Sequence, residues 1–180
     1  MNQNELTSYI TELGATGIGF VDVCDIKIND EFRGLCENNA CGNYGRNYMC
    51  PPAYGTMDEC RAVAKSYQKA VVVQLIHELE DSFDFEGMQL GAKKHSDIVR
   101  SIKQHFEKNY SKDILALAAG GCSLCETCGI ITNTPCPNPE LTMASVEGYG
   151  MDVTQLAALA GMPFKWGEPR VYYVGVVLYN

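Results

Sequence analysis

The residues of this chain with the clearest chemical potential are its cysteines. The sequence holds nine cysteines but only three histidines in 180 residues. Three cysteines follow one another at two-residue gaps, in the motif Cys122-x2-Cys125-x2-Cys128. Gaps of this size let one tight turn present three thiolates to neighbouring corners of an iron–sulfur cube. This motif therefore predicts a [4Fe-4S] cluster.

A fourth cysteine, Cys136, follows this motif after seven residues and precedes Pro137. A terminal Cys-Pro pair is typical of the cysteine runs of bacterial ferredoxins. Zinc is the main competing metal, and a closed zinc site usually takes two separated pairs of cysteines. Three overlapping cysteines fit that pattern less well, so zinc is the less favoured alternative.

A second set of cysteines, Cys36, Cys41 and Cys50, lies in an earlier segment rich in glycine. Exposed free thiols oxidise readily, which makes three of them a poor choice for a plain surface loop. We therefore expect this segment to bind metal as well. Arg46 lies between two of these cysteines, where it could balance the charge of a cluster or hold an anionic substrate.

The seven loop cysteines divide into four and three, whereas two cubes need four ligands each. The missing ligand could be water or substrate, a non-cysteine side chain, or Cys24 as a reserve ligand. Cys60 falls on an apolar helix face and reads as a buried structural thiol. If Cys136 crosses to the first set, the open iron belongs to the second set. The seven residues between Cys128 and Cys136 favour a turn that brings Cys136 back to the same cluster. In that case the open iron belongs to the first set.

The elements that must position these cysteines follow the same order in both halves of the chain, about 1–80 and 81–180. Each half reads as helix, strand, cysteine loop, helix and strand. Apolar periodicity and capping patterns predict helices over 6–13, 56–69, 84–106 and 152–160, and strands over 17–23, 70–76, 113–119 and 170–179. His95 falls on the apolar stripe of the third helix, where we expect a core histidine.

This order predicts one α/β domain over residues 1–180. Its sheet of about four strands should be mainly parallel, possibly mixed, with flanking helices. Both cysteine loops follow strands, and open sheets place ligands at the carboxyl ends of strands. We therefore expect the two loops to lie near one another.

The composition excludes several classes of partner. The net charge is −8, which disfavours nucleic acid and anionic membranes because both bind basic surfaces. The sequence has neither a signal-peptide pattern nor an apolar stretch of about 20 residues. We therefore expect a cytoplasmic protein, in which cysteines serve as metal or redox groups more often than as disulfides.

Three segments resemble a known prokaryotic family, the predicted metal-binding proteins with a domain of unknown function called DUF2284. They are Tyr44–Pro52, Gly120–Cys128 and Ser145–Val153. The resemblance covers nearly the whole chain. It implies cytosolic metal binding with no assigned reaction.

The leading functional hypothesis is an iron–sulfur protein that transfers electrons to a redox partner protein. The alternative is an enzyme whose three-cysteine cluster uses an open iron for Lewis-acid or sulfur chemistry on a small substrate. A third interpretation, a zinc-binding interaction module, keeps the fold and removes the redox chemistry.

Overall fold

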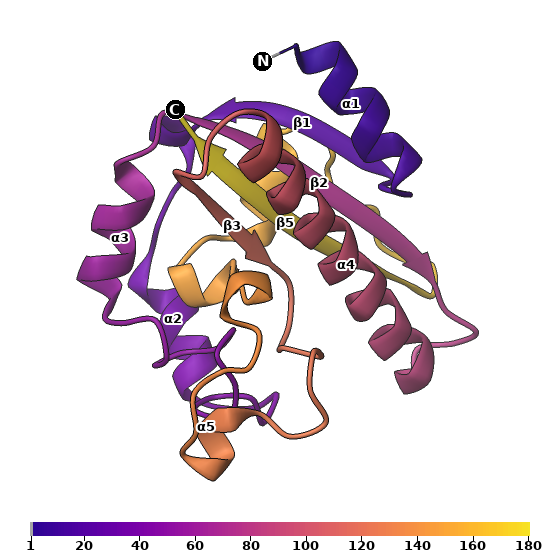
Figure 1. The fold of residues 1–180 in the computed structure, drawn as a ribbon. Coiled ribbons are helices and arrows are strands. Elements are labelled where there is room, and N and C mark those ends of the chain that lie inside the picture. Colours follow the sequence, from indigo (N-terminus) through magenta and orange to yellow (C-terminus); the bar gives the residue numbers. More distant parts are fainter. Residues whose placement is uncertain (1) are drawn as a thin grey trace.

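The computed structural model describes residues 2–180, which form a five-stranded sheet with helices on both faces (Figure 1). The strands are β1 (Gly17–Asp22), β2 (Lys69–Glu78), β3 (Ile114–Ala118), β4 (Ala144–Ser145) and β5 (Arg170–Tyr179). Their order in the sheet is β1-β2-β5-β3-β4. Only β3 and β4 pair in parallel, and the other three pairings are antiparallel. The α/β class is confirmed, but the prediction of a mainly parallel sheet with about four strands is wrong.

The cause of this error is the path of the chain between β1 and β2. Asp22 at the end of β1 pairs with Lys69 at the start of β2, so the chain returns to the point it left. A parallel crossover needs one helix to carry the chain back along the sheet. Here the first cysteine segment leads the chain away, and the helix α3 (Met57–Lys65) then brings it back (Figure 1). The two displacements cancel, and the strands become antiparallel.

The four predicted helices are present as α1 (Gln3–Glu12), α3, α4 (Phe85–Asn109) and α6 (Val153–Leu159). Two further helices, α2 (Asp30–Glu37) and α5 (Gly129–Thr132), lie inside the cysteine segments that the sequence predicted to be irregular. Short 3-10 turns cover Val23–Asp25 (η1), Pro139–Leu141 (η2) and Glu147–Tyr149 (η3). Helix α2 begins where the side chain of Asn29 accepts the backbone N–H of Glu31. Its eight residues are too few to show a clear apolar period.

The core has two layers, one on each face of the sheet. Val71, Val73 and Leu75 of β2 pack with α1 and α4, whereas Ala70 and Val72 pack with α3 and α6. Successive side chains of a strand point to opposite faces, so a strand covered on both faces must be apolar throughout. The continuous apolar run of β2 is explained by this double cover.

His95 of α4 lies in the layer between that helix and the sheet, with its side chain fully buried. Burial lowers the pKa of His95 to about 4. Neither ring nitrogen has a hydrogen-bond partner among residues 2–180. Gly175 of β5 faces the ring, and a Cβ atom there would lie 3.0 Å from Nε2 of His95. The glycine therefore makes room for a neutral histidine in the core.

None of the helices within the described range 2–180 has the length and apolar character needed to cross a membrane.

The pH dependence of folding should reveal the buried His95. In the unfolded chain a histidine takes up a proton near its usual pKa of 6.5, whereas the folded protein resists protonation until about pH 4. Wild-type stability should therefore fall by about 3 kcal/mol as the pH drops through this interval. The variant His95→Leu should lose most of this dependence in urea unfolding followed by circular dichroism. An equally steep loss in the variant would contradict the assignment.

Candidate metal centre

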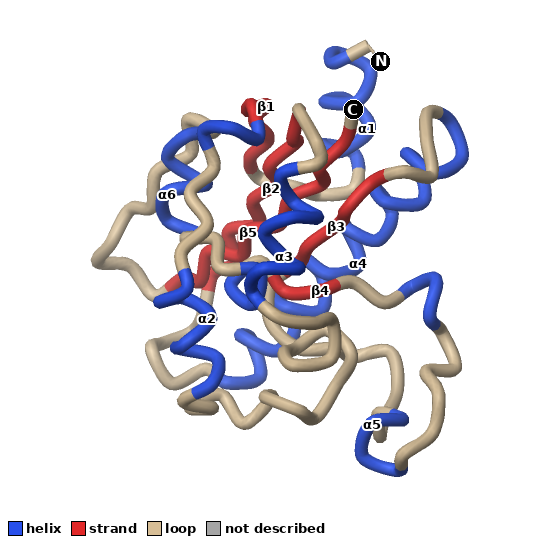
Figure 2. The backbone as a smooth tube through the Cα atoms, turned by 90° about the vertical axis from the view of Figure 1, so that its left-hand side faces the viewer, coloured by secondary structure: helices blue, strands red, loops and turns tan. Residues whose placement is uncertain are grey.

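The two cysteine segments lie at the same end of the molecule, below the sheet, in both backbone views (Figures 1 and 2). Direct hydrogen bonds join them: Tyr48 of the first segment donates its hydroxyl to the carbonyl of Thr134 in the second, at 3.0 Å. The expectation that the loops are neighbours is therefore confirmed. The expectation assumed that both loops follow the carboxyl ends of parallel strands. That assumption is wrong, because β1 and β3 point in opposite directions within the sheet.

Asn47 is the main connection between the two segments. Its side chain is buried, with 5% of the residue exposed. Its Oδ1 atom accepts the backbone N–H of Met49 at 3.0 Å and that of Cys122 at 3.3 Å. One amide oxygen thus fixes both the first loop and the start of the second cysteine motif.

The first set of thiols comes from a helix and the loop that follows it. Cys36 lies on α2, which corrects the prediction of an irregular segment, while Cys41 and Cys50 lie on the loop. Burial, with smaller contributions from the neighbouring thiols of Cys41 and Cys36, raises the pKa of Cys50 to about 11. Burial also raises the pKa of Cys36, with added contributions from Glu147 and Cys41. The three sulfur atoms therefore share one electrostatic environment.

The second set follows β3. Burial raises the pKa of the Cys122 thiol, and the nearby Cys128 and Cys125 raise it as well. Asn138 connects Cys125 and Cys136: its backbone N–H lies 3.4 Å from Sγ of Cys136, and its Nδ2 lies 3.7 Å from Sγ of Cys125. Cys136 therefore lies beside the second set, which supports the local assignment over the crossed one.

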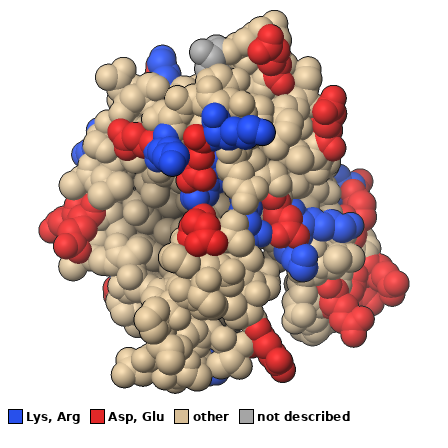
Figure 3. All heavy atoms as spheres, in the orientation of Figure 1, with Lys and Arg blue, Asp and Glu red and all other residues tan. Residues whose placement is uncertain are grey.

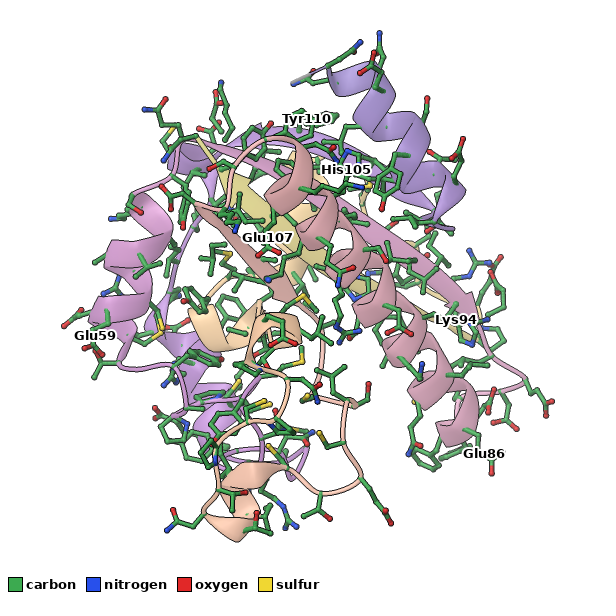
Figure 4. All side chains as sticks on the ribbon, in the orientation of Figure 1. Glu59, Glu86, Lys94, His105, Glu107 and Tyr110 are labelled. Atoms are coloured by element: carbon green, nitrogen blue, oxygen red, sulfur yellow. The ribbon has the colours of Figure 1, made fainter. Side chains whose placement is uncertain are left out.

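The donor set of both segments consists of cysteine thiols. All nine cysteines lie within the described residues, and all are free thiols. In the view of Figure 4, several sulfur atoms appear in the lower part of the molecule, around α2 and α5. No three His, Cys, Asp or Glu side chains of residues 2–180 surround one point as ligands of a single ion would.

The other candidate residues are placed apart from these sets. Cys24 is exposed in η1, at the end of the sheet where β3 begins, and β3 runs away from it towards the second loop. Cys60 is buried in the core, as expected of a structural thiol. Arg46 is exposed, and it forms no ion pair in the part of the chain that the structure describes.

Two residues near the first set were missed by the sequence analysis. Arg33 is buried on α2, one helical turn before Cys36, and donates from Nη1 to the carbonyl of Gly148 at 2.9 Å. Glu147 lies in η3, and burial raises the pKa of its carboxyl. The spacing of Arg33 and Cys36 was a visible signal, because residues three apart share one face of a helix. Glu147 gave no signal beyond its place in the third family-like segment.

Comparisons with known proteins agree with a metal-binding reading at the level of the family. The sequence model of the family described as "Predicted metal-binding protein (DUF2284)" matches residues 19–179. No match was found among curated proteins.

Two solved structures are similar in outline. One is an epoxyqueuosine reductase from Bacillus subtilis, with a TM-score of 0.45 and 10% identity, covering 97% of this chain and 44% of that one. The other is a selenomethionine-labelled epoxyqueuosine reductase, with a TM-score of 0.42 and 11% identity, covering 97% and 45%. This chain thus spans less than half the length of either enzyme. A likeness this weak implies nothing about function.

Removing the Asn47 side chain should weaken the connection between the two cysteine segments. Asn47→Ala leaves the buried backbone N–H of Met49 and the partly buried backbone N–H of Cys122 without their acceptor, which should cost about 2–4 kcal/mol of unfolding free energy. Denaturant unfolding under argon measures this loss. The control is Asn38→Ala, since Asn38 lies in the same segment but is exposed, and its side chain makes no hydrogen bond within residues 2–180. Equal losses of unfolding free energy in both variants would show that Asn47 is not the main connection between the segments.

Proposed function

We propose that this chain, which belongs to the DUF2284 family of predicted metal-binding proteins, binds two [4Fe-4S] clusters and transfers electrons to a redox partner protein. The observation that carries the proposal is the arrangement of seven free thiols in two sets on adjoining segments. The first cluster would be held by Cys36, Cys41 and Cys50, and the second by Cys122, Cys125, Cys128 and Cys136.

Bound clusters of this kind accept and release electrons at potentials set by their surroundings. The contribution of the chain is the environment of the sulfur atoms. Asn138 offers N–H groups to two thiols, and hydrogen bonds of this kind stabilise the negative charge that a thiolate and a reduced cluster carry. The loop segments also limit the access of water, since Cys50 is buried and five of the other six candidate ligands are partly covered.

The surface over the cysteine segments supports contact with a protein partner. On the face shown in Figure 3, charged side chains gather over the upper part of the molecule and are sparse over the lower end, where Figure 1 places these segments. Two large apolar residues of this end are exposed, Leu35 of α2 and Ile131 of α5. The cores of protein interfaces are depleted in charge. Removing water from this surface when a partner docks therefore costs little free energy.

A second candidate function is catalysis on a small substrate. A cleft of about 510 Å3 lies beside Cys122, and Asn43, Lys93 and Tyr173 contribute to its walls. Small-molecule sites are clefts of this size that offer a few polar groups. If a small thiol or anion changes the absorption of the iron-loaded protein, catalysis is favoured. Reversible reduction without such a change favours electron transfer.

Iron analysis tests the proposal directly. Protein purified under argon should be brown and should contain about eight irons and as many sulfides per chain. Cys125→Ser removes one thiolate from the second set, so about half of the iron should be lost and the unfolding midpoint should fall, because metal binding and folding are coupled. The control Cys24→Ser changes an exposed cysteine away from both sets and should keep all the iron. Colourless wild-type protein that holds zinc would refute the iron assignment.

The hydrogen bond from Asn138 to Cys125 leads to a second measurement. Asn138→Ala deletes the Nδ2 donor, so added negative charge on the second cluster is less well stabilised and its reduction potential should fall. A redox titration followed by electron paramagnetic resonance (EPR) measures the shift. Asn109→Ala at the end of α4, where the amide bonds only to His105, should leave the potential unchanged. An unshifted potential in Asn138→Ala would remove Asn138 from the tuning role.

A further inference from the structure

The seven thiols leave one ligand position to explain. Because Asn138 bonds to both Cys125 and Cys136, the second set has four cysteines and the shortage falls on the first set. We infer that Glu147 is the fourth ligand of the first set, so that Cys36, Cys41, Cys50 and the Glu147 carboxylate together hold one cluster. This inference rests on the proposed function and goes beyond it by assigning a non-cysteine ligand.

The backbone on both sides of Glu147 is fixed to the elements that carry the first set. On one side, the N–H of Ser145 donates to the carbonyl of Met49, the residue before Cys50, at 2.9 Å. On the other side, the carbonyl of Gly148 accepts from Arg33, one turn before Cys36, at 2.9 Å. Glu147 is therefore held between the loop that ends in Cys50 and the helix that carries Cys36.

The turn that presents Glu147 has little freedom to move. The hydroxyl of Ser145 accepts the N–H of Gly148 at 3.2 Å and bonds to the hydroxyl of Tyr54 at 3.1 Å. A Cβ atom on Gly148 would lie 2.6 Å from the Ser145 hydroxyl oxygen and would collide with Tyr54. Glycine is thus required for this close packing, and a rigid turn is what a metal ligand needs.

The groups near the Glu147 side chain include acidic ones, and no cationic side chain of the described residues bonds to its carboxylate. In residues 2–180 it forms no ion pair and no side-chain hydrogen bond to another residue. The guanidinium of Arg33 instead donates to the carbonyls of Gly148 and Gly55. Among charged groups, Glu147 is the one that most raises the pKa of the Cys36 thiol.

A half-buried carboxylate that has no ion-pair partner among residues 2–180 is costly to keep in its charged form. A bound cationic iron centre removes that cost by pairing with the carboxylate. Carboxylate oxygen is a harder donor than thiolate and suits iron less well than sulfur does. The iron at Glu147 should therefore be the most readily lost iron of the protein.

The test compares the wild type with Glu147→Ala and Glu147→Gln, all purified under argon. Loss of the carboxylate should lower the iron content by about one per chain while leaving sulfide unchanged. Low-temperature EPR of the oxidised variants should then show a three-iron signal that the wild type lacks. Glu147→Cys supplies a thiolate at the same place and should restore the full iron content, with a shifted reduction potential.

The matched control is Glu37→Ala, which removes a carboxylate adjacent to Cys36 that is exposed and lies 3.9 Å from Arg33. This variant should keep all its iron. Full iron content in Glu147→Gln would overturn the ligand role even if Glu147→Ala fails to fold, since glutamine keeps the shape of the side chain. Iron-free wild-type protein would instead overturn the proposed function, and the ligand role with it. The two failures are therefore distinguishable.

Discussion

The candidate metal centre depends on one buried amide, the side chain of Asn47. Its oxygen accepts backbone N–H groups from both cysteine segments, which are separated by about seventy residues of sequence and leave strands that point in opposite directions. Without this acceptor, one buried and one partly buried donor would lose their partner, and a direct hydrogen-bonded connection between the segments would be lost. The chain between β1 and α2 carries the first segment to the end of the sheet where β3 finishes, and Asn47 fixes how the two segments meet.

The two sets of thiols differ in the way the chain builds them. The second set comes from one short turn and its continuation, with Asn138 bonding two of the four sulfur atoms. The first set combines a helix with a loop, and a 3-10 turn brings Glu147 towards it. A set made of three separate elements depends on tertiary packing at every position. The carboxylate makes this set chemically unlike its neighbour.

Charge connects the centre to the stability of the fold. Burial raises the pKa values of Cys36, Cys50, Cys122 and Glu147, and neighbouring thiols contribute to the rise for the three cysteines, so these groups resist ionisation in the protein alone. Metal binding requires the thiolates and must displace these protons, which couples loading to folding and to pH. Arg33 lies close to the first set, but its donors are used by backbone carbonyls that hold the surrounding turns. The protein thus supplies the framework, and a metal would supply the balancing charge.

The sequence by itself determined the features that local spacing controls. The capping box at Thr56 and the apolar run of β2 follow from neighbouring residues alone, and the spacing of the motif around Cys125 is the local signal that predicts a cluster. Only the tertiary structure decided the direction of the strands, the separation of Cys24 and the positions of Asn47 and Glu147. The physical reason is that a hydrogen-bond partner across the fold is chosen by the path of the chain. An asparagine or glutamate carries no periodic signal that reveals which distant group it will meet.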